Sequence, residues 1–257
     1  MPTLNEELGL KLTLEEIPLD QLEQMGLDHE IIVVDGNSSD KTREIATTYG
    51  ARVILEPCKG YGRAYKTGFE HARGQIIVTL DGDNSYPPLL IPSLIKNLLD
   101  ENLDFVTTNR FANAQRHSFS LLHRLGNRVL SFAFKVLFSA SFKDSQSGMW
   151  VVRRTVVPRI LPDSDSMSFS QEIKIRAYHT CRCAEVPISY RRRVGTPKIR
   201  TLRDGGLNLV YLVRLRILSN IKGSSKFFLD GRVSSVMTSA TEPSDHIFGF
   251  STEKDKP

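Results

Sequence analysis

The sequence contains few cysteines and no long apolar run. Only Cys58, Cys181 and Cys183 occur among 257 residues, which is too few for a disulfide scaffold and predicts a reducing compartment. No stretch reaches the roughly 20 apolar residues that cross a bilayer, and the N-terminal residues lack the basic start and apolar run of a signal peptide. We therefore expect a cytoplasmic location, with at most peripheral contact with the inner face of a membrane.

The sequence also lacks a strong excess of charge of one sign. The formal net charge is +5, charged residues make up 25% of the chain and hydrophobic residues 40%. This composition supports a buried core and a mild preference for anionic partners, such as nucleotide phosphates, lipid phosphates or nucleic acid. A late basic segment, 191–200, has no aromatic platform or nucleic-acid reader motif beside it, so we expect no nucleic-acid partner.

The first 110 residues alternate between short β-rich runs and helical stretches. Strands are expected at 30–34, 51–55, 75–80 and 104–108, and helices at 41–49, 62–72 and 88–97. This alternation predicts an α/β fold with a doubly wound, mostly parallel central sheet flanked by helices. Ligands of such sheets bind beyond the carboxyl ends of the strands, where Asp35, Asp81 and Asp83 are expected.

The rest of the chain has a different character. Residues 118–139 and 202–221 are expected to form peripheral, amphipathic and basic helices. From about residue 223 to 257 the sequence becomes rich in Ser and Thr and loses its periodicity, which predicts a disordered tail. We therefore expect one domain over residues 1–222 and a tail over residues 223–257.

Two carboxylates follow the third apolar run. Asp81 and Asp83 flank Gly82, and hard oxygen ligands of this kind suit Mg²⁺ or Mn²⁺ bridging a diphosphate. The alternative is a loop with two solvated acids. The position at the end of a buried strand favours the metal site.

Three further segments carry chemical signals. Asp35 ends the first apolar run, before a turn whose Ser39 or Asp40 can cap the next helix; capping does not explain Asp35, which is placed to bind a base or ribose. The Gly-rich turn 59–64 can approach phosphates or serve as a simple flexible loop. The basic segment 191–200 can close over a diphosphate, or form a solvated charge run or a membrane-surface patch.

These segments belong to an ordered series of motifs. The series is 2–6 (PTLNE), 33–42 (VVDGNSSDKT), 60–64 (GYGRA), 80–83 (LDGD), 108–111 (TNRF), 144–150 (DSQSGMW), 171–172 (QE), 185–188 (EVPI) and 195–198 (GTPK). Over residues 1–220 it resembles the family-2 glycosyltransferases with the GT-A fold, especially the polyprenol-phosphate (dolichol-phosphate) sugar synthases.

The resemblance implies roles for particular residues. The residues implied to bind the donor are Pro2, Leu4, Glu6, Val33, Asp35, Asp81, Gly82, Arg193 and Lys198. Of these, Pro2, Leu4, Glu6 and Asp35 would line the nucleoside pocket, and Arg193 and Lys198 would contact the phosphates. The metal would be held by Asp81, Asp83 and Ser85. The acceptor would be bound by Arg124, Arg128 and Gln146. Catalytic roles would fall to Asp83, Arg110 and Glu172, the last as a base if the acceptor is a sugar hydroxyl.

Two departures from the family pattern stand out. The family has an apolar strand directly before the segment 2–6, and Met1 stands where that strand ends; we expect a start upstream of Met1 or a truncated product, with neighbouring strands exposed. Pro197 replaces a serine common in the basic loop of relatives, which leaves the contacts of that loop open.

The resemblance implies an inverting, metal-dependent transfer of a sugar from a GDP- or UDP-linked donor to a polyprenyl (dolichyl) phosphate at the cytoplasmic membrane face. A phosphate acceptor is already an anion and needs no strong base. Transfer to a sugar hydroxyl or another soluble acceptor is a second hypothesis. A nucleotidyltransferase is less favoured, because its N-terminal Gly-rich signature is missing from 2–11, and a non-catalytic binding module is also less favoured.

Overall fold

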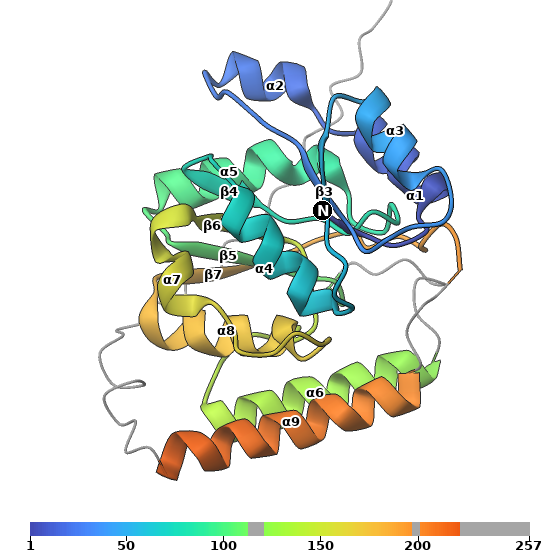
Figure 1. Cartoon of the computed structure of the whole chain (residues 1–257). Coiled ribbons are helices and arrows are strands. Elements are labelled where there is room, and N and C mark those ends of the chain that lie inside the picture. The colour runs from blue at the N-terminus through green and yellow to red at the C-terminus, as the bar shows by residue number, and fades with distance from the viewer. Residues whose placement is uncertain (113–120, 197–200, 222–257) are drawn as a thin grey trace, which may run out of the picture.

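The computed structural model describes residues 1–112, 121–196 and 201–221 (Figure 1). Its strands are β1 (Pro2–Thr3), β2 (Ile32–Asp35), β3 (Arg52–Leu55), β4 (Ile76–Val78), β5 (Phe105–Asn109), β6 (Trp150–Arg153) and β7 (Cys183–Pro187). Its α-helices are α1 (Glu7–Glu15), α2 (Leu19–Gln24), α3 (Thr42–Thr48), α4 (Tyr61–His71), α5 (Ile91–Asp100), α6 (Leu121–Phe138), α7 (Val157–Ile160), α8 (Phe169–Thr180) and α9 (Thr201–Ile221). Two 3-10 helices, η1 (Pro88–Leu90) and η2 (Arg154–Val156), precede α5 and α7.

The α/β alternation predicted for the first 110 residues is confirmed. Each expected strand and helix is present, with ends that differ by up to about three residues. Helix α3 ends where Gly50 adopts a φ of +73°, the left-handed conformation that glycine tolerates best. The two later amphipathic helices are also present as α6 and α9, whereas the segment expected to form a disordered tail lies outside the described residues.

The strands form two sheets. One is parallel, with the order β1-β2-β3, and the other has the order β4-β6-β5-β7. In the second sheet β6 runs antiparallel to both of its neighbours, while β5 and β7 are parallel. The sheet is thus mostly parallel in its strand pairs, as predicted, but its hydrogen bonding is interrupted between β1 and β4.

A cavity of about 550 Å³ lies at this interruption. Its lining includes Met1, Ile32 and Val34 on one side, and Ile76 and Val78 on the other. The expectation that a strand precedes Met1 and covers these neighbours stays a prediction. The Met1 amino group donates a hydrogen bond to the carbonyl oxygen of Ile32 at 2.8 Å, and burial lowers its pKa to about 6.

The largest part of the core lies between the second sheet and the helices below it in Figure 1. Trp150 and Phe105 from the sheet, Phe169 from α8 and Phe134 from α6 are all fully buried in it. Helices α6 and α9 lie side by side across this layer (Figure 1). They are therefore attached to the domain by one apolar face each, which leaves their other faces exposed.

Candidate active site

The loops that follow the carboxyl ends of β1 and β2 are hydrogen-bonded to each other. The backbone N–H of Asn5 donates to the Ser38 hydroxyl at 2.9 Å, and that of Glu6 donates to the Thr42 hydroxyl at 2.9 Å. In return, the Ser39 N–H donates to the Asn5 side-chain oxygen at 2.7 Å. These reciprocal bonds explain the polar residues after Asp35, which hold the first loop against the second.

Asp35 lies beneath these loops and is fully buried. Its Oδ2 accepts from the Ser38 N–H at 3.0 Å and from Arg43 at 3.2 Å. Its Oδ1 is buried without a hydrogen-bond partner among the described residues. A buried carboxylate oxygen without a partner is costly, and a ligand N–H or O–H at this strand end would satisfy it.

The segment 81–85 lies close to β1 and α1 because two glycines allow it. A Cβ atom on Gly82 would lie 2.8 Å from the Thr3 side chain, and one on Gly9 would lie 2.7 Å from the Cα atom of Asp83. Thr3 is in turn the register partner of Asp35. The structure thus brings the Asp81–Asp83 segment and Asp35 to the same end of the molecule, as predicted.

The two aspartates each have one oxygen held by the protein. Oδ1 of Asp81 accepts from the hydroxyls of Tyr61 and Tyr65, each at 3.3 Å. Oδ1 of Asp83 accepts from the backbone N–H of Ser85 at 3.0 Å and also from the Ser85 hydroxyl. Ser85 is fully buried and supports the Asp83 carboxylate; its role as a direct metal ligand stays a prediction.

Two arginines lie beside these carboxylates. Arg193 pairs with Glu6 at 2.7 Å and with Oδ2 of Asp83 at 3.5 Å, while its Nε has no partner among the described residues. Arg110 is buried and forms two hydrogen bonds to Asp144, at 2.7 and 2.9 Å. The Arg193 guanidinium therefore lies beside Asp83, whereas that of Arg110 is held by Asp144.

The charges of this site fit a divalent cation. Burial, followed by the neighbouring Asp83 carboxylate, raises the pKa of Asp81 to about 7, although the nearby Arg110 opposes this shift. Two adjacent acids that repel each other are stabilised by a cation between them. The described residues contain no group of three or more His, Cys, Asp or Glu side chains suited to a metal, so the remaining ligands would come from a donor diphosphate and water.

The residues predicted to bind the acceptor are found on or near α6. Arg124 and Arg128 are exposed on this helix. Gln146 follows Asp144 and accepts a weak hydrogen bond from Asn208 of α9 at 3.5 Å. The Nε2 atom of Gln146 is buried without a partner among the described residues, which leaves it a donor for a ligand.

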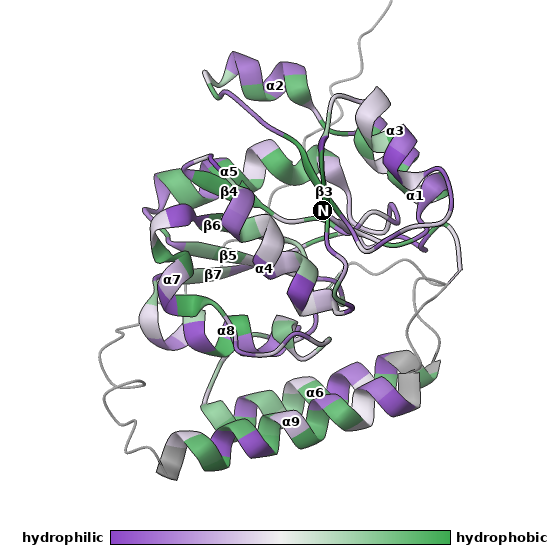
Figure 2. Ribbon diagram, viewed as in Figure 1, coloured by the Kyte–Doolittle hydropathy of each residue, from purple (hydrophilic) through white to green (hydrophobic). Residues whose placement is uncertain are grey.

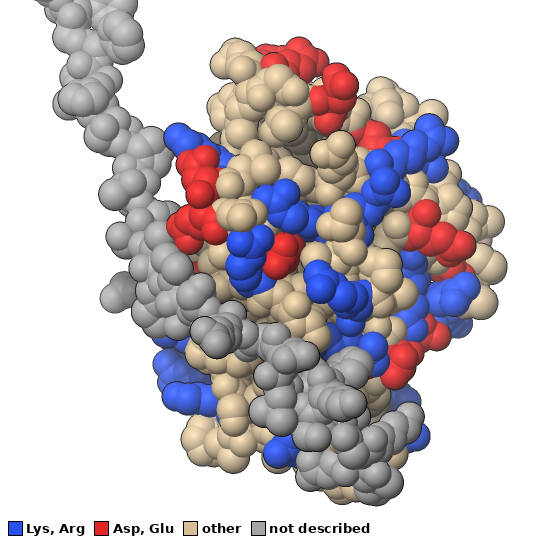
Figure 3. All heavy atoms as spheres, turned by 90° about the vertical axis from the view of Figure 1, so that its left-hand side faces the viewer, with Lys and Arg blue, Asp and Glu red and all other residues tan. Residues whose placement is uncertain are grey.

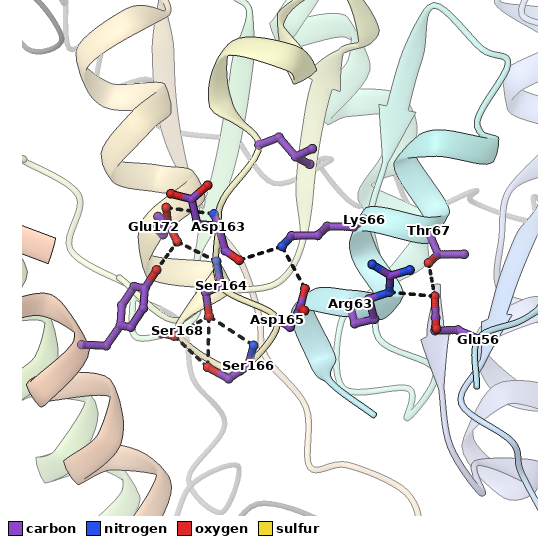
Figure 4. Close-up of polar contacts among 12 residues, drawn as sticks. Glu56, Arg63, Lys66, Thr67, Asp163, Ser164, Asp165, Ser166, Ser168 and Glu172 are labelled. Carbon is purple, nitrogen blue, oxygen red and sulfur yellow. Dashed lines mark hydrogen bonds and ion pairs between the residues drawn. The ribbon is translucent and has the colours of Figure 1, made fainter. Parts of the chain in front are cut away.

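Glu172 occupies a closed polar network (Figure 4). Its Oε1 accepts from the Asp163 N–H at 3.0 Å and from Arg176 at 2.6 Å. Its Oε2 accepts from the Ser164 N–H at 3.1 Å and from the Tyr211 hydroxyl at 2.6 Å. The side chain is fully buried and both oxygens are occupied. This arrangement argues against the predicted base and makes Glu172 a tie between α8, α9 and the loop 161–168.

Three further predicted donor residues have different surroundings. Val33 is fully buried in a core cluster with Leu10 and Ala46, so its predicted contact with the donor stays a prediction and would fall to its backbone. Pro2 lines the cavity between the sheets. Leu4 is 43% exposed in the loop after β1, and Lys198 lies outside the described residues.

Sequence reasoning missed Tyr61, Tyr65 and Asp144 as members of this site. Tyr61 belongs to the Gly-rich turn, whose composition predicts only a phosphate-binding or flexible loop, and Asp144 belongs to the segment 144–150, whose pattern assigns it no role. The spacing of Tyr61 and Tyr65, four residues apart, places both on one face of a helix. That signal is local, and nothing in the sequence indicates that this face points at Asp81.

The comparisons with known proteins agree with this geometry. Residues 1–161 match the sequence profile of Glycosyl transferase family 2, and the chain belongs to this family. It is 32% identical over 206 residues to a dolichyl-phosphate hexose transferase of Haloferax volcanii, covering 80% of this chain and 87% of that protein. It is also 32% identical over 216 residues to the low-salt glycan biosynthesis hexosyltransferase Agl6 of the same organism, covering 83% of this chain.

The chain spans only part of some relatives, 52% of the length of Agl6 and 62% of the glycosyltransferase AglJ. Among solved structures it resembles glucosyl-3-phosphoglycerate synthase from Mycobacterium tuberculosis in complex with Mn²⁺, UDP and glucosyl-3-phosphoglycerate. The TM-score is 0.64 at 22% identity, covering 85% of this chain and 77% of that chain. The fold is thus of the GT-A type.

Proposed function

We propose that this glycosyltransferase moves a hexose from a nucleoside-diphosphate sugar to a polyprenyl (dolichyl) phosphate at a membrane surface. The observation that carries the proposal is the meeting of Asp81, Asp83 and Arg193 at the strand ends beside Asp35. Two carboxylates and a guanidinium suit a metal-bound diphosphate. The orphan Oδ1 of Asp35 suits an N–H or O–H of the nucleoside.

The residues of the chain would act mainly by positioning and charge stabilisation. An acceptor phosphate oxygen attacks the anomeric carbon as the bond to the nucleoside diphosphate breaks, and the leaving diphosphate takes the bonding electrons. A divalent cation held by Asp81 and Asp83 would neutralise charge on that leaving group. Arg193 would turn from Asp83 and Glu6 towards the phosphates. A phosphate acceptor needs no general base, which accords with the occupied carboxylate of Glu172.

The lipid acceptor is supported by the exposed faces of α6 and α9. Large apolar side chains are 40–70% exposed along both helices. On α6 they are Leu122, Leu125, Val129, Phe132 and Val136, and on α9 they are Leu207, Val210, Val213, Ile217 and Leu218. The spacing of three and four residues, with Leu218 directly after Ile217, makes one stripe on each helix. Polar residues lie between the apolar ones (Figure 2).

Such a surface suits the headgroup region of a lipid bilayer. Arg124 and Arg128 are exposed on α6, and Arg214 is exposed on α9, where they can meet lipid phosphates. None of the described helices has the length and apolar character needed to cross a membrane. On the face shown in Figure 3, basic side chains are dispersed among acidic ones, so the overall basic charge is not gathered into a single patch there.

The proposal is tested by transfer assays with a panel of UDP- and GDP-sugars, with Mn²⁺ or Mg²⁺, with and without polyprenyl phosphate in liposomes. The expected result is metal-dependent formation of a polyprenyl-phosphate sugar and loss of turnover in Asp83→Asn. Full activity on a soluble sugar or sugar phosphate without lipid would overturn the lipid acceptor. Unchanged behaviour of Asp83→Asn would overturn the hypothesis that the protein is a metal-dependent enzyme. Release of pyrophosphate from a nucleoside triphosphate would favour a nucleotidyltransferase.

A further inference from the structure

Two tyrosines of α4 converge on a single oxygen of Asp81. The hydroxyls of Tyr61 and Tyr65 are each 3.3 Å from Oδ1 and 3.3 Å from each other. Tyr65 also lies 3.2 Å from the carbonyl oxygen of Gly148. No hydrogen bond to Oδ2 of Asp81 is found among the residues that the structure describes. The two carboxylate oxygens therefore have unequal surroundings.

The tyrosines are suited to remain hydrogen-bond donors. A tyrosine hydroxyl keeps its proton at neutral pH, because the ordinary pKa of this group is about 10. An ionised carboxylate accepts only, so both hydroxyls can donate to Oδ1, with the Gly148 carbonyl oxygen as a second acceptor for Tyr65. Oδ2 is left for a ligand.

The pair is also held rigidly. The ring of Tyr65 is 4% exposed and stacks on Phe169, with centroids 5.5 Å apart, and it also contacts Trp150. A Cβ atom on Gly148 would clash with the Tyr61 hydroxyl. Movement of the Tyr65 ring away from Asp81 would disturb these contacts with Phe169 and Trp150.

We propose that Tyr61 and Tyr65 are positioning residues that reserve Oδ1 of Asp81, so that a metal ion meets this carboxylate through Oδ2 alone. The proposal rests on the proposed function, because it deepens the role of the same metal site. A carboxylate with one available oxygen binds in a monodentate manner. Mg²⁺ and Mn²⁺ accept this in octahedral sites, whereas Ca²⁺ takes more oxygens and readily uses both from one carboxylate. The tyrosine pair thus selects the smaller cations.

Asp83 supports this interpretation independently. Its Oδ1 is held by the N–H and hydroxyl of Ser85, while its Oδ2 faces Arg193. Both aspartates therefore present one oxygen each. The site as a whole disfavours a cation that needs bidentate carboxylates.

The test compares Tyr61→Phe, Tyr65→Phe and the double variant with the unaltered protein. Binding of Mn²⁺, Mg²⁺ and Ca²⁺ is measured by calorimetry in the presence of UDP or GDP, together with the melting temperature. The double variant should bind Mn²⁺ about tenfold more weakly, as is typical when a partner of a metal ligand is lost. Its Ca²⁺ affinity should fall less or rise, so that the preference for Mn²⁺ over Ca²⁺ decreases.

Tyr49→Phe is the matched control, because Tyr49 is a tyrosine whose hydroxyl bonds to Glu15 at an exposed site. It should leave all three affinities unchanged. A double variant with a lower melting temperature but an unchanged Mn²⁺/Ca²⁺ preference would overturn the proposal, since packing alone would explain it. So would a double variant that behaves like the unaltered protein.

Asp83→Asn separates this inference from the proposed function. If Asp83→Asn binds Mn²⁺ as tightly as the unaltered protein, the metal site itself is wrong and both proposals fail. If Asp83→Asn loses Mn²⁺ binding while the tyrosine double variant keeps the full preference for Mn²⁺, only the role of the tyrosines fails.

Discussion

At the residue scale, buried charged groups determine the electrostatics of the candidate active site. Asp81 lies between two tyrosine hydroxyls and a second carboxylate, and its pKa is raised to about 7. Arg110 is stabilised by Asp144, whose own pKa is lowered by the guanidinium despite its burial. Burial raises the pKa of both acids, and the Asp83 carboxylate raises that of Asp81 further, whereas at Asp144 the contacts with Arg110 outweigh burial.

Asp81 should couple metal binding to proton release. Below about pH 7 the carboxyl is protonated in the metal-free protein, and a cation must displace that proton. Mn²⁺ affinity should therefore rise with pH up to about 7 and level off above it. Calorimetry in buffers of different ionisation enthalpy should find protons released at about pH 6 and almost none at about pH 8. Release that does not vary with pH would contradict this assignment.

The same shift affects the metal-free fold. The pKa of Asp81 in the folded chain, about 7, lies above its ordinary value of 3.8, so the folded chain holds the proton more tightly than the unfolded chain. The stability contributed by this group is therefore present at low pH and falls as pH rises from about 4 to about 7. Asp81→Asn should remove that part of the pH dependence of the melting temperature.

The buried pair of Arg110 and Asp144 should be essential for stability. Asp144→Asn keeps the shape of the side chain but leaves the guanidinium without its counterion, which should cost about 3 to 5 kcal/mol. Asp163→Asn is the control, because the Asp163 side chain is 86% exposed beside Arg176, and the change should be about 0.5 kcal/mol or less. Urea denaturation measures the free energy of unfolding of both variants. Equal losses would show that the buried ion pair contributes no more to stability than the exposed one.

At the scale of elements, α4 joins the cavity to the site. Its Tyr61 and Tyr65 reach Asp81, while Gly68 lines the cavity between the sheets. Near its start, Gly62 lies against Phe169 and the loop 161–168. One face of the helix is therefore tightly packed and another borders empty space.

Two glycine substitutions in α4 should have opposite effects. A Cβ atom on Gly68 meets only Val34, at 3.4 Å, so Gly68→Ala should stabilise the protein by about 0.5 to 1 kcal/mol through helix propensity. A Cβ atom on Gly62 would lie 2.7 Å from both the Phe169 Cβ and the Ser164 carbonyl oxygen, so Gly62→Ala should destabilise it. Melting temperatures of the two variants provide the test. A shift of the same sign in both would show that the room around the added Cβ atom does not decide the effect.

The exposed stripe on α6 should be needed for binding to lipid. Phe132 is 70% exposed and Val136 is 62% exposed, so replacing both with Glu should leave the fold intact and abolish sedimentation with anionic liposomes. Leu89→Glu changes an equally apolar residue, 55% exposed in η1, and should leave sedimentation unaltered. If the α6 variant still sedimented with liposomes, the exposed stripe of α6 would be excluded as the lipid-binding surface.

The elements differ in how well the sequence predicts them. Strand β2 and helix α3 follow from an apolar run and a capped amphipathic stretch, which are local signals. Helix α8 is harder to predict because its residues from Phe169 to Ile175 are buried, including Glu172 and Lys174. Buried polar residues hide the apolar periodicity that sequence reasoning uses.

At the scale of the whole molecule, the strand order decides which residues meet. The sequence predicts that Asp35, Asp81 and Asp83 share one edge, because parallel strands present their carboxyl ends together. It also predicts that the late arginines approach, through the resemblance to a known family. The partners Tyr61, Tyr65 and Asp144 depend on packing between distant segments, and the sequence offers no local signal for them.

The cavity between the sheets has a mechanical consequence. Closely packed side chains hold neighbouring strands together, and a water-accessible opening between two sheets removes that packing. The opening of about 550 Å³ lies between β1 and β4, which are not paired with each other among the described strands. Local opening should therefore separate the sheet β1-β2-β3 from the sheet β4-β6-β5-β7 before it disrupts the aromatic core around Trp150, and hydrogen exchange of the two sheets measures that order.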